Sequence, residues 1–420
     1  MSIQGRVAAV EDALHRLDGD LPALSDRALA ATGAPRVRIL RAAVARPYGL
    51  PLDDVADLAA LDGVHLDPVD ASLLAGVRAL VHHGPRAATP ELVRHGRDHP
   101  DDLAGGVVRT LALTTTGVPG DRELAHALVE RDAARHPGDW RAAAPLAMVR
   151  QEQRRYDEAR ALATAVLAEE PGNGHGAHVV AHCDYETGAH DAGLAWLDGW
   201  RAGRRVALYG EHLAWHGALH ALARGDTADA LRRYVTGVGP ARVADAGPLL
   251  WRCRLHEGAA DADVARLAAE AAAAAREVLD RAPHFPLLGA CFALAAAGDA
   301  DTLRVLAVAL AADARPARAD LLAPVARALA ALAAQEPGAA VAELDAVLPG
   351  LARVGGSNAQ REVVEDTLLH ALLADGRAER ARTLLLARLE RRDHVPDRRL
   401  LARCRAATAD ADTVRCRHPV

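Results

Sequence analysis

Two stretches of the sequence place histidines four residues apart, a spacing that can build a polar site on one face of a helix. His178 and His182 lie in GAHVVAHCDYE, and His212, His216 and His220 lie in GEHLAWHGALHAL. Four residues of an α-helix turn by about 40° beyond a full circle, so the members of each set share a face. The two stretches lie about one helical-repeat period apart, so we expect them to face each other across a groove.

These histidines can serve three kinds of site. A metal site would combine His178 and His182 with His212 and His216, because zinc accepts neutral imidazoles in tetrahedral geometry. A metal-free site would use the same rings for proton transfer or for binding an anionic ligand. A buried hydrogen-bond network would instead fix the register of neighbouring repeats without binding anything. We predict no cofactor and keep a transition metal as the alternative.

Neighbouring residues narrow the chemistry. Glu186 lies one turn beyond the first pair and Glu211 precedes the second, so either carboxylate could orient an imidazole. A metalloprotease is excluded, because the HExxH motif needs glutamate directly after its first histidine and the chain has Val179 and Leu213 there. The catalytic candidates are His178, His182, His212, His216 and Glu186.

Aromatic residues concentrate around the same helices. Residues 175–234 contain seven of the 20 histidines and six of the 12 aromatic residues, which are five Trp, five Tyr and two Phe. Aromatic rings give large contact areas at low entropic cost, so this concentration predicts a ligand surface. A third segment, residues 355–381, places Gln360 and Arg361 at the start of a helix. The predicted ligand-binding residues are His178, His182, Trp215, His216, Gln360 and Arg361.

The elements that position these residues follow a repeating helix–turn–helix pattern. Turn positions recur at 154, 188, 225, 298, 337 and 376, at intervals of 34 to 39 residues and one interval of 73, which is close to two periods. The apolar residues between them follow helical periodicity. This spacing is typical of tetratricopeptide-like helix pairs. We therefore predict an all-α, tetratricopeptide-like helical-repeat solenoid with a less regular helical N-terminal cap, with helices that include 175–187, 211–224, 317–335, 338–351 and, last, 377–391.

The predicted organisation has four parts. Residues 1–130 form a divergent N-terminal helical region, and residues 131–236 form a first repeat arm that carries the His- and Trp-rich helices. The Gly- and Pro-rich stretch TGVGPARVADAGP contains a candidate hinge at 237–248. A second repeat arm follows at 249–420, and a bend at the hinge would let the two arms enclose a groove.

Composition excludes several classes of function. All 50 basic residues of this 420-residue chain are arginine, which excludes the usual pyridoxal-phosphate enzymes and Walker-type nucleotide hydrolases, since both need lysine. A net charge of -6 with interspersed signs offers no basic surface to nucleic acid or membranes. Because no long apolar run occurs, we expect a cytoplasmic protein. Five scattered cysteines without a CxxC pair predict reduced, buried thiols.

Three ordered segments resemble the family of tetratricopeptide repeat protein 38 and its bacterial relatives: HVVAHCDYETGAHDAGLAWL, HLAWHGALHALARGDTADAL and GGSNAQREVVEDTLLHALLADGRAERARTLLLARL. The resemblance covers roughly residues 130–400 and implies a helical-repeat fold without assigning a reaction. The family's paired-histidine helices match here at His178 and His182 and at His212 and His216. Relatives commonly have histidine after GGS where this chain has Asn358, which weakens a metal-ligand role shared by the whole family.

We therefore expect a helical-repeat protein that binds a small molecule or peptide in a concave pocket lined by histidine and tryptophan. The alternative is an enzyme, metabolic tailoring or hydrolytic, that uses the paired histidines for acid–base or metal chemistry. A third option is a protein-interaction scaffold whose concave face holds an extended peptide. The expected partner is a small molecule, a peptide or a protein rather than nucleic acid or a membrane, and the sequence indicates no oligomeric state.

Overall fold

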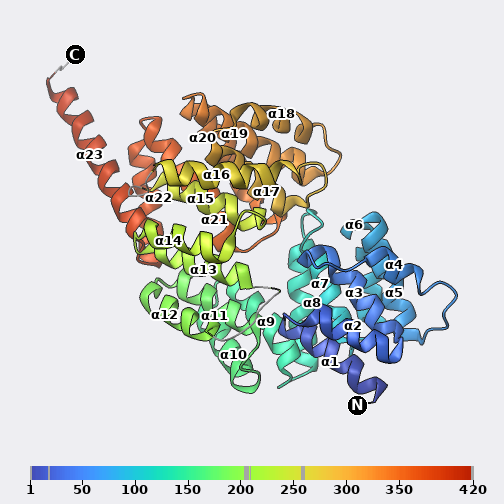
Figure 1. Cartoon of the computed structure of the whole chain (residues 1–420). Coiled ribbons are helices and arrows are strands. Elements are labelled where there is room, and N and C mark those ends of the chain that lie inside the picture. The colour runs from blue at the N-terminus through green and yellow to red at the C-terminus, as the bar shows by residue number, and fades with distance from the viewer. Residues whose placement is uncertain (1, 18, 203–207, 209, 257–260, 418–420) are drawn as a thin grey trace. The chain divides into compact units, whose positions relative to one another are not determined.

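The computed structural model is built from α-helices joined by short turns (Figure 1). It describes residues 2–17, 19–202, 208, 210–256 and 261–417, and within these ranges every regular element is helical. The predicted all-α class is therefore confirmed. Among the helices described there, none is both long enough and apolar enough to cross a membrane.

The chain packs as two contact units, each described here by itself. Unit 1 comprises residues 1–183 and 200–210, and unit 2 comprises residues 184–199 and 211–420. The division passes through helices α11 (Gly174–Glu186) and α12 (His190–Arg201), so each of these helices contributes residues to both units.

Unit 1 contains ten complete helices that pack mainly against their neighbours in sequence. Its core is aliphatic, with Ile39, Leu73, Val77 and Leu92 fully buried. These helices range in length from 6 residues in α4 to 16 residues in α5. They are α1 (Ile3–Arg16), α2 (Leu21–Thr32), α3 (Pro35–Tyr48), α4 (Asp54–Ala59), α5 (Pro68–His83), α6 (Pro85–Asp98), α7 (Leu103–Leu113), α8 (Asp121–Arg135), α9 (Trp140–Glu152) and α10 (Tyr156–Glu169).

Unit 2 contains most of the remaining helices, and its core is rich in alanine and leucine. Helices α15 (Val243–Leu255) and α17 (His284–Ala297) pack closely, because a Cβ placed on Gly247 would lie 2.1 Å from the carbonyl oxygen of Gly289. Only glycine allows the two backbones to come so close. The helices are α13 (Gly210–Ala223), α14 (Thr227–Arg233), α15 (Val243–Leu255), α16 (Asp261–Arg276), α17 (His284–Ala297), α18 (Ala300–Ala311), α19 (Ala323–Ala333), α20 (Pro337–Val347), α21 (Asn358–Ala374), α22 (Ala378–Arg391) and α23 (Val395–Arg417).

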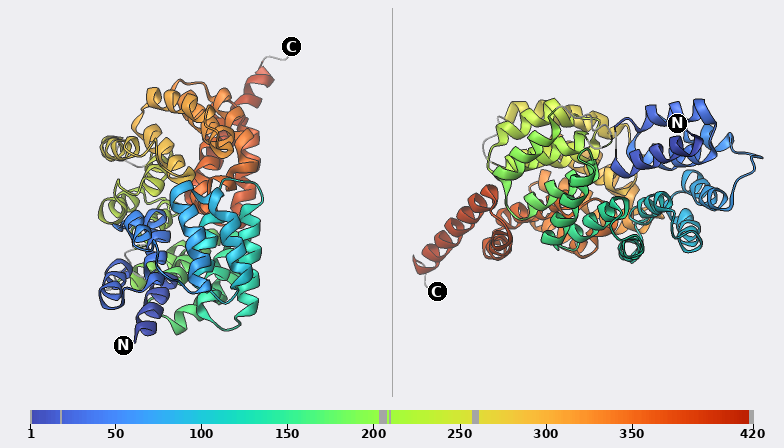
Figure 2. Two further views of the ribbon diagram at one scale, coloured as in Figure 1. Left: turned by 90° about the vertical axis from the view of Figure 1, so that its right-hand side faces the viewer. Right: turned by 90° about the horizontal axis from the view of Figure 1, so that it is seen from below.

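Three short elements depart from α-helical geometry: π-helical turns at η1 (Tyr234–Val238) and η2 (Arg318–Leu322), and a 3-10 helix at η3 (Leu348–Val354). The helix predicted at 317–335 therefore begins as a π-turn before α19. The helix predicted at 338–351 ends at Val347, because Pro349 has no N–H to continue the α-helical pattern. Beyond the last predicted helix, the structure adds α23, which begins against α22 and whose C-terminal end extends away from the other helices of unit 2 (Figure 2).

The predicted turns fall between consecutive helices, and each has a residue with left-handed backbone geometry. At five of the six predicted turns, the predicted residue itself has this geometry. At the sixth, Pro337 already begins α20, and the left-handed residue is Gln335, two positions earlier. The interval of 73 residues, from 225 to 298, contains the four helices α14 to α17. Residues 257–260, between α15 and α16, lie outside the described residues. The φ angles are 63° at Arg154, 80° at Gly188, 81° at Gly225, 76° at Gly298, 61° at Gln335 and 74° at Gly376.

Candidate metal centre

The first histidine pair lies on α11, which begins at a capped turn. The side-chain oxygen of Asn173 accepts a hydrogen bond from the backbone N–H of Gly176 at 2.8 Å, so the predicted cap is confirmed. His178 and His182 are 4% and 0% exposed, and their Nε2 atoms lie 3.0 Å apart. The four-residue spacing therefore brings two imidazole nitrogens together inside the protein.

The second pair lies on α13, of which every residue from His212 to Ala223 is buried. The rings of His212 and Trp215 are stacked with their centroids 5.1 Å apart. His216 meets both rings nearly edge-on, with centroids 4.8 Å from His212 and 4.9 Å from Trp215. Trp215 thus packs directly against both imidazoles, and these contacts restrict the rotation of the two histidines.

Asp245 on α15 is the carboxylate that orients His212, a role for which the sequence suggested Glu211 or Glu186. Its Oδ2 lies 3.0 Å from His212 Nδ1, and its Oδ1 accepts a hydrogen bond from Gln360 Nε2 at 2.9 Å. Burial alone would raise the pKa of Asp245, but His212, Arg242 and Gln360 outweigh it and lower the pKa to about 2. Asp245 is therefore a fully buried, ionised carboxylate.

The four predicted metal candidates converge. One ligand nitrogen from each of His178, His182, His212 and His216 lies within 4.8 Å of the other three. A tetrahedral zinc ion with bonds of about 2.05 Å holds its nitrogens about 3.3 Å apart. The 3.0 Å between the Nε2 atoms of His178 and His182 is already close to that value. The donor set and its spacing therefore fit an ion with four imidazole ligands.

None of the four cysteines whose side chains the structure describes belongs to this donor set. Cys183, Cys253, Cys291 and Cys404 are buried and unbridged, as predicted, while the side chain of Cys416 lies outside the described part of the chain. Burial raises the pKa of the thiols of Cys253 and Cys291 to about 12. The Cys183 thiol, next to His182 in sequence, points to the carbonyl oxygen of Tyr156 at 3.6 Å.

Two other predicted site residues have partners of their own. Glu186 lies 3.4 Å from Nη1 of Arg392 and belongs to an ion-pair network of unit 2. Arg361 donates hydrogen bonds to the carbonyl oxygen of Gly355 at 3.1 Å and to Asn358 Oδ1 at 2.9 Å. Its guanidinium therefore holds the turn that precedes its own helix.

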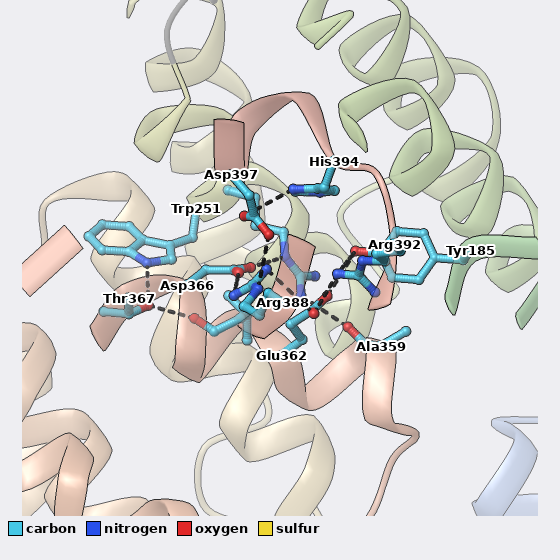
Figure 3. A network of polar contacts seen from close by, with 12 residues as sticks. Tyr185, Trp251, Ala359, Glu362, Asp366, Thr367, Arg388, Arg392, His394 and Asp397 are labelled. Atoms are coloured by element: carbon cyan, nitrogen blue, oxygen red, sulfur yellow. Dashed lines mark hydrogen bonds and ion pairs between the residues drawn. The ribbon is translucent and has the colours of Figure 1, made fainter. Parts of the chain in front are cut away.

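The ion-pair network of unit 2 joins α21, α22 and α23 through buried charges (Figure 3). Arg388 lies 2.8 Å from Asp366, 3.4 Å from Glu362 and 3.0 Å from Asp397. Arg392, the residue that directly follows the end of α22, pairs with Glu362 as well. All five side chains are buried, so each charge depends on its partners for solvation.

Residues from α11 and α15 complete this network. The Tyr185 hydroxyl donates to Glu362 at 2.9 Å, and the Arg392 guanidinium lies 4.3 Å from the centroid of the Tyr185 ring. Arg252 donates to Asp366 at 2.7 Å and to the carbonyl oxygen of Ala359 at 3.0 Å. The network therefore stabilises the packing of five helices. Sequence reasoning missed it.

A row of imidazoles runs beside the network. Ring centroids lie 5.5 Å apart for His220 and His190, 6.3 Å for His190 and His394, 6.4 Å for His394 and His256, and 6.5 Å for His256 and His370. Burial lowers the pKa of His190 and His370 to about 4 and that of His256 to about 3. These three rings are therefore neutral at pH 7.

We expect stability to fall on mild acidification. Between pH 6.5 and 4 the unfolded chain protonates His190, His256 and His370 while the folded chain keeps them neutral, so unfolding is favoured as the pH falls. Each contributes at most about 1.4 kcal/mol per pH unit in this window. Urea unfolding at pH 7.5, 6.5, 5.5 and 4.5 measures the slope, and His370→Gln should reduce it. A stability independent of pH between 6.5 and 4.5 would contradict the neutral rings.

No protein-family model matches the chain, and no curated protein matches it significantly.

Proposed function

We propose that this protein binds a divalent transition metal ion, zinc in the first instance, through the imidazoles of His178, His182, His212 and His216. The supporting observation is the convergence of one nitrogen from each within 4.8 Å. Imidazole nitrogen is a preferred ligand of zinc and also suits copper, nickel and iron(II). Four such side chains supply the full ligand number of a tetrahedral zinc site.

An ion suits the cluster better than an organic ligand does. The four histidines are at most 4% exposed, and Trp215 is 0% exposed. Organic ligands need cavities of about 300–1,000 Å³ with accessible lining side chains. An ion instead occupies the space between its own ligands, so burial of the histidines favours it.

A structural role follows more directly from this ligand set than a catalytic one. Catalytic zinc sites keep a coordination position for water or substrate, whereas structural sites take all four ligands from the protein. With all four imidazoles bound, a tetrahedral ion would have no coordination position left for water or substrate. The enzyme alternative would require one of the four histidines to remain unligated.

We also infer that α11/α12 and α13/α14 are consecutive tetratricopeptide-like repeats. His178 and His212 are 34 residues apart, and so are His182 and His216. Thirty-four residues is about the period of this repeat class, and both pairs lie on the first helix of a helix pair. The same side chains would then occupy equivalent positions in neighbouring repeats.

Zinc titration of the full chain tests the proposal. Protein purified without a histidine tag, treated with chelator and dialysed, should bind one zinc ion per chain in competition with a chelating dye. Binding to the folded state alone should also raise the melting temperature. Failure to retain zinc against a weak competitor would reject the metal site and favour the metal-free interpretations of the histidines.

A further inference from the structure

We infer that Asp245 is a positioning residue for the proposed metal site: it holds His212 in the tautomer that presents Nε2 to the ion, and it supplies compensating negative charge. The inference rests on the proposed function. It concerns residues of α13, α15 and α21, all within unit 2.

The hydrogen bond between Asp245 and His212 determines the tautomer. A carboxylate can only accept, so the 3.0 Å contact between Asp245 Oδ2 and His212 Nδ1 places the ring proton on Nδ1. A neutral imidazole then carries its free lone pair on Nε2. Nε2 is therefore the nitrogen that His212 can offer to a metal. The nitrogens of His178 and His182 that lie 3.0 Å apart are also their Nε2 atoms.

Asp245 is itself held in place. Its second oxygen accepts the hydrogen bond from Gln360 Nε2 at 2.9 Å, and Gln360 Oε1 accepts the backbone N–H of Ser357 at 2.9 Å in the capping box of α21. Because both ends of the Gln360 amide are engaged, the amide cannot rotate without losing a buried hydrogen bond. This explains the position of Gln360, a predicted ligand-binding residue that reaches His212 only through Asp245.

The charge of the site gives Asp245 a second role. Four neutral imidazoles leave both positive charges of a divalent ion uncompensated, which is costly in a buried setting. Asp245 is 0% exposed and touches a ligand ring directly. Carboxylates that accept from metal-bound histidines raise the basicity of the ligand, and losing them typically lowers metal affinity 10–100-fold.

The test compares zinc affinities of full-length variants by competition with a chelating dye. Asp245→Asn keeps the shape of the side chain but loses its charge, and we expect zinc affinity to fall about 10–100-fold. Asp366→Asn is the matched control, because Asp366 is also a buried aspartate of unit 2 but pairs with Arg252 and Arg388. Its zinc affinity should stay close to that of the wild type.

A second measurement uses the wild type alone, so it does not depend on the folding of a variant. In protein labelled with 15N-histidine and loaded with zinc, His212 should carry its proton on Nδ1 and the metal on Nε2. Asp245→Asn with wild-type affinity, or His212 ligated through Nδ1, would overturn the positioning role and leave the metal site standing. A wild type that binds no zinc would overturn both.

Discussion

Replacing His216 by alanine will lower zinc affinity by more than about 100-fold. Loss of a hydrogen-bonding partner behind a ligand already costs 10–100-fold, and His216→Ala removes one of the four proposed ligands itself. His216 is 0% exposed and contacts His212 and Trp215, so the variant will also lose packing and some stability. Zinc affinity by dye competition separates the two effects, because it is measured on folded protein.

His220→Ala is the matched control for this variant. His220 lies one turn further along α13, is also 0% exposed, and is adjacent to His190 rather than part of the four-histidine group. We expect zinc affinity within about threefold of the wild type, a difference of under 1 kcal/mol. Similar losses of zinc in both variants would mean that any cavity in α13 disrupts binding, and would contradict direct ligation by His216.

Glu362→Gln will strongly destabilise the protein through the ion-pair network of unit 2. Glu362 faces Arg388 and Arg392 and accepts the Tyr185 hydroxyl, and these arginines hold its pKa well below the usual value although burial alone would raise it. The neutral amide would leave two buried guanidinium groups short of negative charge. We expect the free energy of unfolding to fall by about 3–5 kcal/mol, measured by urea denaturation at pH 7.5.

Glu343→Gln serves as the control for Glu362→Gln. Glu343 pairs with Arg327 at 2.7 Å on the surface of unit 2. Exposed ion pairs of this kind contribute about 0–1 kcal/mol, so the variant should unfold close to the wild type. A Glu362→Gln effect as small as that of Glu343→Gln would show that the buried charges are not coupled as the distances indicate.

The spacing of residues along each helix was sufficient to predict the histidine pairs but not their partners. A four-residue interval fixes which side chains share a face, whatever the rest of the fold does. Asp245 lies 33 positions after His212, and no local pattern connects the two. The sequence therefore assigned the orienting role to Glu186 or Glu211, which are near in sequence, and Glu186 pairs with Arg392 instead.

Four-residue spacing also occurs among the charged residues of the ion-pair network, and it could have been used to predict their pairing. Glu362 and Asp366 are four residues apart on α21, and Arg388, in the last turn of α22, is four residues before Arg392, which caps that helix. Two acidic and two basic residues with matching intervals on consecutive helices predict a pairing across those helices. Their burial could not be predicted, because it depends on α23 and α15 covering them.

The helix boundaries were predictable where glycine marked the turns and less so elsewhere. Gly188, Gly225, Gly298 and Gly376 adopt the left-handed conformation that ends a helix. The π-helical and 3-10 segments and α23 were missed. The π-helical and 3-10 segments differ from an α-helix only in which backbone groups are hydrogen-bonded, and composition does not specify this. The 23-residue α23 is highly charged, and its amphipathic pattern is weak.

X-ray absorption at the zinc edge tests the central claim most directly. The zinc-loaded wild type should show four nitrogen neighbours at about 2.0–2.1 Å with the outer-shell scattering of imidazole rings. His216→Ala loaded at high zinc should show one imidazole fewer. Sulfur neighbours, a shell made mainly of carboxylate or water oxygen, or an unchanged imidazole number in the variant would contradict a centre built from His178, His182, His212 and His216.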